Sequence, residues 1–244
     1  MQLEIDLCQK FKDSKGTYGK RRLCEALRQQ GYQIGRAKTR SLMKKHGLIA
    51  VVPKKKHYYP NAGDECMYAP NLLKRQFKPD SVGTHWCGDI TYIKTHAGWC
   101  YLACIIDLGS KEIVGYATSK SPDSQLTIAA LNNAIQNTNA DTTQLMFHSD
   151  QGCQYSSKAF RKKLKSLKIM QSMSRRGNCW DNAIMERFFR NLKTEYLNRV
   201  TIINFDSANK LIDEYIRFYN FRRLNSAIGY LTPYQKGKLM RKVA

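Results

Sequence analysis

The spacing of apolar residues changes repeatedly along the chain, and each spacing predicts a different kind of element. Short apolar segments typical of strands occupy residues 85–94, 99–108, 112–120, 145–150 and 169–174. Longer segments with helical spacing occupy residues 123–137, 156–167, 181–197 and 205–221. Ala97-Gly98 and Gly109-Ser110 break the first three strands, so these strands should form an antiparallel meander. The order is three strands, helix, strand, helix, strand, helix.

This order predicts an α/β fold with a ribonuclease-H-like, mixed five-stranded sheet flanked by helices. The strand at 145–150 should lie parallel to the first strand and beside it. Asp89 and Asp150 would then be neighbours. The helix at 205–221, followed by a proline-containing tail, should pack on this core.

Two short helices are predicted near the beginning of the chain, at residues 20–30 and 36–46, with stops at Gly31 and Gly47. Apolar residues can pack between them: Leu23, Ala26 and Leu27 against Leu42 and Met43. The second helix keeps a basic set facing outward: Arg36, Lys38, Arg40, Lys44 and Lys45. This is a helix-turn-helix candidate for DNA binding. An ordinary basic helical hairpin would give the same pattern.

Domain boundaries follow from these patterns. Residues 51–80 contain Pro53, Pro60, Pro70 and Pro79 without sustained periodicity, which indicates a basic linker. We therefore expect four parts: a helical, helix-turn-helix-like domain at 1–50, the linker at 51–80, the ribonuclease-H-like core at 81–198, and a C-terminal helix and tail at 199–244.

The charge is strongly positive and unevenly distributed. The formal net charge is +22 and the sequence pI is about 9.8, which points to a polyanionic partner. Residues 1–80 carry 18 basic and 7 acidic side chains, whereas residues 81–150 carry 3 basic and 6 acidic ones. An acidic centre between basic flanks argues against a generally basic protein of the ribosome-associated kind.

Membrane, secretory and zinc-binding classes are disfavoured. No apolar stretch is long enough to span a bilayer, and the first ten residues lack the order of a secretory signal, so we expect a cytoplasmic protein. The eight cysteines are scattered singly, as expected of reduced thiols, and we predict neither disulfides nor a zinc site. Cys100 and Cys104 are interpreted as core residues.

Three acidic residues could carry metal chemistry, although each also has an ordinary explanation. Asp89 lies within a strand and could simply occupy its polar face. Asp150 ends a strand and could stabilise a turn. Glu186 lies on a helix and could pair with Arg190 four residues later. In the predicted sheet, however, two of these acids lie on adjacent strands, and the third lies on a helix that crosses the same edge of the sheet.

The spacing and several strings then reveal a resemblance. Asp89 and Asp150 are separated by 60 residues, and Asp150 and Glu186 by 35. The relevant strings are HWCGDITYI, IIDLGSKEIVGYA, FHSDQGCQY, NCWDNAIMERFFRNLKTEY and YIRFYNFRRLNSAIGYLTPYQ. From about Tyr18 to Gln235 the chain resembles the second-frame transposases of frameshifting bacterial insertion sequences, which share a D,D(35)E catalytic core with retroviral-type integrases.

The resemblance implies that Asp89, Asp150 and Glu186 bind two Mg²⁺ ions, for which Mn²⁺ can substitute, and that Lys193 contacts DNA near the cleaved end. The residues fit this role, because Glu186, Arg190 and Lys193 share one helical face on which the basic pair could hold phosphate. A basic loop before this helix could clamp a strand or simply be solvated; it contains Arg175 and Arg176. Gln151 and Cys153, which follow Asp150, differ from the residues that the resembled family usually carries at these positions.

Other polar residues are given structural roles. Asp181 and Asn182 should cap the helix that carries Glu186. Asp107 and Glu112 flank a turn and are assigned to it. His148 could touch substrate, but a packed strand histidine fits its position better.

The leading hypothesis is a DNA transposase that cleaves insertion-sequence ends and transfers the 3′-hydroxyl strand in a metal-dependent reaction, giving DNA integration. We expect it to act at the bacterial nucleoid as a homo-oligomer on terminal repeats and target DNA, alone or with an upstream-frame protein or fusion. Alternatives are a catalytically silent DNA-binding regulator or remnant, and a retroviral-type integrase. The last is disfavoured because its zinc-binding His-His-Cys-Cys module is absent from the sequence.

Overall fold

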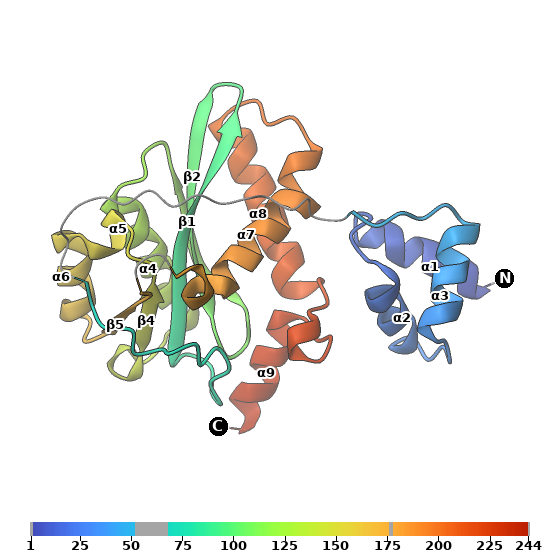
Figure 1. The fold of residues 1–244 in the computed structure, drawn as a ribbon, viewed down its shortest axis with the longest axis horizontal. Coiled ribbons are helices and arrows are strands. Elements are labelled where there is room, and N and C mark those ends of the chain that lie inside the picture. Colours follow the sequence, from blue (N-terminus) through green and yellow to red (C-terminus); the bar gives the residue numbers. More distant parts are fainter. Residues whose placement is uncertain (1, 52–67, 176–177, 244) are drawn as a thin grey trace.

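The centre of the molecule is a mixed sheet of five strands in the order β3-β2-β1-β4-β5 (Figure 1). This computed structural model describes residues 2–51, 68–175 and 178–243. The strands are β1 (His85–Thr95), β2 (Gly98–Asp107), β3 (Ile113–Ser119), β4 (Met146–Ser149) and β5 (Met170–Met173). β1, β2 and β3 form the expected antiparallel meander, and β4 lies parallel to β1, as predicted. β5 extends the sheet in parallel with β4.

Helices cover both faces of the sheet. One face carries α4 (Ser124–Thr138), the short α5 (Cys153–Ser156) and α6 (Lys158–Ser166), and it buries Trp86, Phe147 and Phe160. The other carries α7 (Ala183–Glu195) and α8 (Phe205–Phe221), and it buries Cys104, Phe188 and Tyr215. Alternate residues of each strand point to opposite faces, so both layers draw on the same strands. These layers form the ribonuclease-H-like core.

Gly88 shows how tightly this core is packed beside the acidic residues. A Cβ atom at this position would lie 2.4 Å from the ring of Phe147. The strand therefore needs glycine here, since any side chain would displace a buried aromatic ring. Cys100 and Cys104 are fully buried, as expected for core residues.

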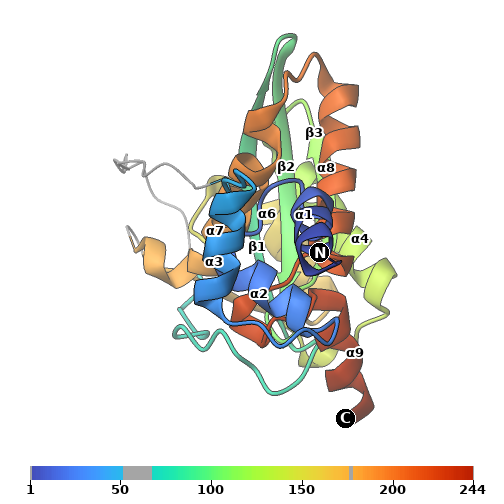
Figure 2. The same cartoon turned by 90° about the vertical axis from the view of Figure 1, so that its right-hand side faces the viewer.

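The N-terminal domain contains α1 (Gln2–Asp13), α2 (Lys20–Arg28) and α3 (Arg36–Lys45). The two predicted helices are confirmed, with positive φ at both Gly31 and Gly47. α1 was not predicted; its Leu7 joins Leu27 and Leu42 in a small core. Figure 2 views the molecule from the side of this domain, with its helices in front of the sheet.

The N-terminal domain packs directly against the chain that follows α8. The Tyr18 hydroxyl donates to the carbonyl of Arg222 at 3.0 Å and accepts from the amide of Leu224 at 2.7 Å. Leu224 also joins a small apolar cluster with Tyr18, Leu23 and Met43. These contacts hold the N-terminal domain against the segment that follows α8.

The C-terminal part contains more helix than predicted. The segment described from the sequence as a proline-containing tail forms α9 (Pro233–Val243). This helix begins with a proline at the first helical position, where its missing N–H costs nothing. Short 3-10 turns occupy Thr142–Gln144, Cys179–Asn182, Leu197–Arg199 and Ser226–Ile228. Among the described residues, no helix combines the length and apolar character needed to cross a bilayer.

Candidate active site

Strand pairing brings two of the predicted acids together. Gly88 on β1 lies opposite Ser149 on β4 in the last pair of the parallel ladder. Asp89 and Asp150 follow immediately, each partly buried. Asp89 Oδ1 accepts the Ile90 amide at 2.7 Å, and Asp150 Oδ1 accepts the Gly152 amide at 3.0 Å. Both carboxylates are therefore held in place at one edge of the sheet.

The environment disfavours negative charge on these two residues. Burial, followed by the nearby charge of Asp150, raises the pKa of Asp89 well above its usual value. Burial likewise raises the pKa of Asp150. The positive charge of Lys193 acts on Asp89 in the opposite direction but does not outweigh these effects. Ionising both carboxyls would therefore place two negative charges close together where little water is present.

Glu186 approaches the pair from α7. It is the fourth residue of that helix and its side chain is exposed. Burial raises its pKa and Arg190 lowers it, while its own charge contributes to the raised pKa of Asp89. Among the described residues, no three His, Cys, Asp or Glu side chains are already grouped closely enough to hold a metal ion. Glu186 is therefore near the aspartates without completing a closed ligand set.

Two basic residues of α7 lie on the same side of the helix as Glu186. Arg190 and Lys193 follow it by four and seven residues, and both exert an electrostatic effect on the acids. In the N-terminal domain, Arg36, Lys38 and Arg40 are exposed along α3, as the sequence indicated. Arg176 lies outside the described residues.

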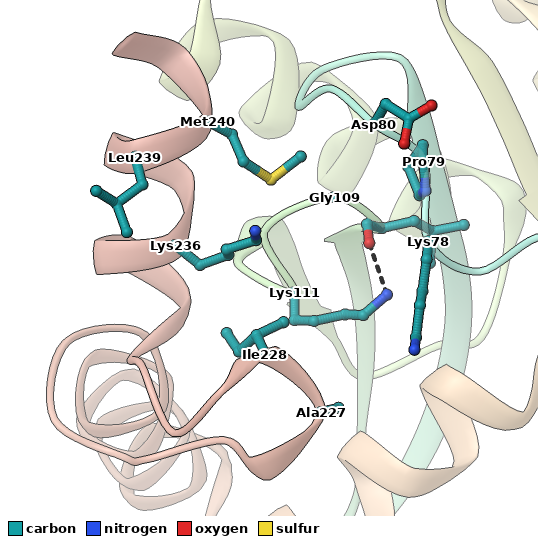
Figure 3. Close-up of a pocket in the computed structure, with 11 residues that line it drawn as sticks. Lys78, Pro79, Asp80, Gly109, Lys111, Ala227, Ile228, Lys236, Leu239 and Met240 are labelled. Atoms are coloured by element: carbon teal, nitrogen blue, oxygen red, sulfur yellow. Dashed lines mark hydrogen bonds between the residues drawn. The ribbon is translucent and has the colours of Figure 1, made fainter. Parts of the chain in front are cut away.

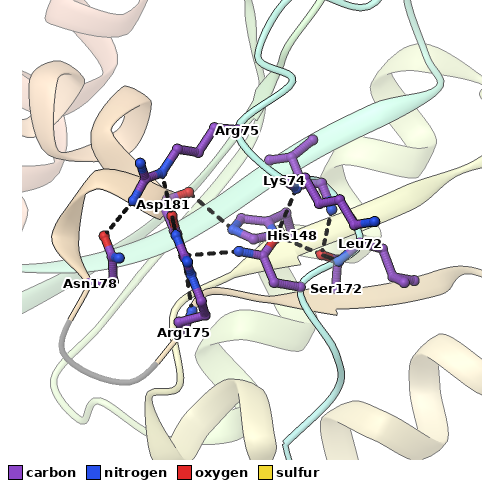
Figure 4. Close-up of polar contacts among 10 residues, drawn as sticks. Leu72, Lys74, Arg75, His148, Ser172, Arg175, Asn178 and Asp181 are labelled. Carbon is purple, nitrogen blue, oxygen red and sulfur yellow. Dashed lines mark hydrogen bonds and ion pairs between the residues drawn. The ribbon is translucent and has the colours of Figure 1, made fainter.

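Asp181 does not cap α7, so that prediction was wrong. Its buried carboxylate accepts from Arg75 Nε at 2.7 Å, Arg175 Nε at 3.0 Å and Asn71 Nδ2 at 2.9 Å (Figure 4). The side-chain hydrogen bond from Arg175 is the largest cause that lowers the pKa of Asp181. Asn182 makes no side-chain cap either; instead it accepts a hydrogen bond from Cys87 Sγ at 3.3 Å. Arg175 is thus engaged in an ion pair before any contact with DNA.

The hydrogen-bonded residues around Asp181, which we call the hub, also include His148. This histidine is packed in its strand, as expected. Its Nδ1 lies 2.8 Å from Ser172 Oγ, and its Nε2 lies 3.1 Å from the Asp181 carbonyl oxygen (Figure 4). Burial lowers the pKa of His148 to about 4, so the ring is neutral at pH 7. The hub joins residues 71–75, β4, β5 and the start of α7. Sequence reasoning missed Arg75, because nothing local connects it to Asp181.

The turn between β2 and β3 has the structural role assigned to it. Asp107 Oδ1 accepts the Ser110 amide at 2.8 Å, and Glu112 lies 3.7 Å from Arg241. A cavity of about 550 Å³ lies between this turn and α9, lined in part by Lys78, Lys111 and Lys236 (Figure 3). Lys111 Nζ donates to the Leu108 carbonyl at 2.6 Å and also to that of Phe77, which anchors it within the turn.

A second hollow begins beside Lys193. It has a volume of about 850 Å³ and is bounded by residues 92–96 and Trp99 of the β1–β2 hairpin, by Lys193, and by residues 197–198 and 200–202. We name it the hairpin groove.

Comparison with known families and proteins agrees with this geometry. Residues 79–179 and 167–233 match the integrase core domain family, and residues 8–56 match an HTH-like domain. The chain is 38% identical over 221 residues to the insertion element IS600 uncharacterized 31 kDa protein of Shigella sonnei, covering 90% of this chain and 81% of the relative. It is 34% identical to the putative transposase InsK for IS150 of Escherichia coli, covering 91% and 78%.

Two solved structures share the fold. The catalytic core domain of HTLV-2 integrase, determined in complex with magnesium, gives a TM-score of 0.51 at 20% identity, covering 64% of this chain and 96% of that one. The simian T-cell lymphotropic virus intasome with the PP2A regulatory subunit B56 gamma gives 0.55 at 19% identity, covering 88% and 70%. At such identities the likeness concerns the fold alone.

Proposed function

This chain belongs to the insertion-sequence transposases that carry an integrase core domain, and we propose that it cleaves and joins DNA through Asp89, Asp150 and Glu186. The observation that carries the proposal is the pairing of β1 with β4, which places Asp89 and Asp150 side by side in an environment that raises the pKa of both. Fixed like charges that cost stability are typical of functional sites. DNA is the partner that the HTH-like and integrase core domains imply.

Divalent cations fit this donor set. Oxygen ligands from carboxylates are what Mg²⁺ and Mn²⁺ prefer, and a cation would relieve the repulsion between Asp89 and Asp150. Asp89, Asp150 and Glu186 would hold such ions, which would supply activation of the attacking oxygen and stabilisation of the leaving oxygen in an in-line displacement. Asp89 and Asp150 hold fixed positions through their backbone hydrogen bonds, while Glu186 completes the set from α7.

The basic side chains position the DNA. Arg190 and Lys193 are proposed to bind phosphates beside the reacting bond, because they continue the helical face that carries Glu186. Arg36, Lys38 and Arg40 on α3 are proposed to contact duplex DNA away from it. Arg175 is proposed to reach DNA from its ion pair with Asp181, since its side chain remains 60% exposed.

The finer partners follow from the same reaction. We propose that the ends of an insertion sequence and a target duplex are the substrates, and that the protein acts as a homo-oligomer on them at the bacterial nucleoid. An upstream-frame protein or fusion would supply further end recognition.

The decisive experiment is strand cleavage and joining on a labelled duplex carrying the element's terminal repeats, with Mg²⁺. Wild type should give joined products and Glu186→Gln should give none, while both bind the duplex equally. Glu214→Gln is the matched control, because Glu214 is 61% exposed on α8. Joining by Glu186→Gln at the wild-type rate would refute the assignment.

A silent DNA-binding regulator is the second candidate, favoured by the absence of a closed three-residue ligand set among the described residues. It predicts that wild type binds the terminal repeats but never joins them, even as a fusion with the upstream frame. Calorimetric titration with Mn²⁺ separates the two: the transposase loses Mn²⁺ binding on Asp89→Asn, whereas the regulator binds none.

A further inference from the structure

The hairpin groove exists because β4 is short. β4 ends at Ser149, opposite Gly88, so in the described structure β1 has no strand beside it on that edge from Asp89 to Thr95. The β1–β2 hairpin projects beyond the rest of the sheet (Figure 1). Its far end is closed by hydrogen bonds from the His96 and Ala97 amides to the carbonyls of Ile202 and Ile203, at 2.9 and 3.0 Å. The floor of this groove is the unpaired edge of β1, and the tip of the hairpin closes one end of it.

Two large aromatic side chains are presented to solvent here. Tyr92 is 55% exposed and Trp99 is 53% exposed. Tyr92 lies opposite Tyr101 in the ladder and meets its ring edge-on at 5.5 Å, while Trp99 lies opposite Lys94. These side chains therefore share one face of the hairpin, and the Tyr101 ring supports Tyr92 from the neighbouring strand. Exposed aromatics gathered at one place indicate a binding surface.

The charge around the groove selects the kind of ligand. Its lining includes Lys94, His96 and Lys193 and, among the residues that the structure describes, no aspartate or glutamate. Exposed apolar residues at its rim, Val200 and Ile203, would also suit a protein partner. The excess of positive charge instead favours a polyanion with flat apolar groups, which is the chemistry of single-stranded nucleic acid.

The groove also leads to the candidate active site. Tyr92 follows Asp89 by three residues, and after burial the charges of Asp89 and Asp150 are the next causes that raise its pKa. Lys193 bounds the groove and also acts electrostatically on Asp89. A strand that crosses the open edge of β1 can therefore contact both the groove and the acids.

We propose that the hairpin groove binds unpaired nucleotides of the DNA end adjoining the reacting phosphodiester, with bases stacked on Tyr92 and Trp99 and phosphates beside Lys94 and Lys193. This inference rests on the proposed function, because it names the part of the substrate that the site receives. Separating the strands at a duplex end costs stacking energy, and stacking on aromatic side chains offsets that cost.

The test measures binding alone, without metal, so that no cleavage occurs. Fluorescence anisotropy compares a labelled duplex that ends in a short thymidine tail with its blunt counterpart. Wild type should bind the tailed duplex about ten-fold more tightly, and Trp99→Ala or Tyr92→Ala should each remove most of that preference, with a smaller loss of affinity for the blunt duplex. Trp99→Phe should retain it. Tyr234→Ala, an exposed aromatic on α9, is the matched control.

Photocrosslinking supplies a second readout. A 5-iodo-deoxyuridine in the tail should crosslink to Tyr92 or Trp99. Equal affinity of wild type for tailed and blunt duplexes, or crosslinks confined to other residues, would overturn the proposal. So would a change in oligomeric state on Trp99→Ala without any tail preference, which would assign the groove to a protein partner. Wild type that joins DNA without tail preference would refute the groove and leave the transposase function standing.

Discussion

Buried carboxylates occur at two neighbouring places in this protein and behave in opposite ways. Burial and mutual repulsion raise the pKa of Asp89, whereas hydrogen bonds from arginines lower the pKa of Asp181. The side chain of Asp181 is only 1% exposed, so burial alone does not explain the difference. The nature of the neighbours does. Asp181 is neutralised within the fold, while the Asp89–Asp150 pair retains negative charge that a cation can neutralise.

A third carboxylate shows that the Asp181 arrangement is the structural one. Glu195, at the end of α7, accepts from Arg223 at 2.6 and 2.7 Å and from the Tyr215 hydroxyl at 3.0 Å. Arg22 of the N-terminal domain lies 3.5 Å from it. Neutralised acids thus hold α7 at both ends, and the acid between them, Glu186, faces the aspartate pair.

The largest effect on DNA joining should come from removing a negative charge at the Asp89–Asp150 pair. Asp89→Asn keeps the hydrogen bond to the Ile90 amide but removes a carboxylate ligand, so DNA joining should fall at least about a thousand-fold. Thermal stability should stay the same or increase, because a repulsion disappears. Joining assays and thermal melts on one preparation check both. Joining within ten-fold of wild type would contradict the assignment of Asp89 as a metal ligand.

The next largest effect should come from a neutralised acid that loses its partner. Arg223→Met removes the buried partner of Glu195, and the free energy of unfolding should fall by about 3 kcal/mol. Urea denaturation measures it. The exposed neighbour provides the control, since Arg222→Met should change stability by less than about 0.5 kcal/mol. Equal effects of the two variants would show that the Glu195 ion pair contributes nothing specific.

Asp181→Asn should have a smaller effect, because its arginine partners are partly exposed. Losing the carboxylate charge should cost about 2 kcal/mol of unfolding free energy. Joining should also fall, by about ten-fold, because the hub that positions β4 against the start of α7 is weakened. Urea denaturation and the joining assay test this, with the exposed Asp206→Asn as control. A stability equal to that of wild type would contradict the prediction.

The smallest effect concerns pH. A carboxyl whose folded-state pKa is raised contributes stability below its unfolded pKa and loses it as pH rises through the folded pKa. Asp89 should therefore reduce the stability of wild type as pH rises from 4 towards neutrality, a loss that Asp89→Asn removes. His148 acts in the other direction: with a pKa lowered to about 4, it costs stability as pH falls below its unfolded value.

Urea denaturation from pH 4 to 8 measures these slopes. The difference between wild type and Asp89→Asn cancels the contribution of His148, which both proteins share. Mg²⁺ should stabilise wild type more at pH 8 than at pH 4, because its carboxylate ligands must be ionised, and should have little effect on the variant. A pH-independent difference would contradict the raised pKa.

The sequence by itself determined the local elements and the acids. Short apolar segments identified the five strands, and helical spacing identified α8, whose bounds match the predicted range 205–221. The order of elements fixed β4 beside β1, which brings Asp89 and Asp150 together. α1 and α9 were not predicted; in the second, Pro233 begins a helix although proline usually interrupts one.

Only the tertiary structure decided what each charged residue does. Arg75 and Asp181 are 106 positions apart, and Arg223 and Glu195 are 28 apart, so no periodicity or capping signal could pair them. The hairpin groove likewise depends on where β4 stops relative to β1. Local spacing encodes secondary structure because neighbouring residues share one backbone, whereas a carboxylate's pKa depends on whichever charges the fold brings near it.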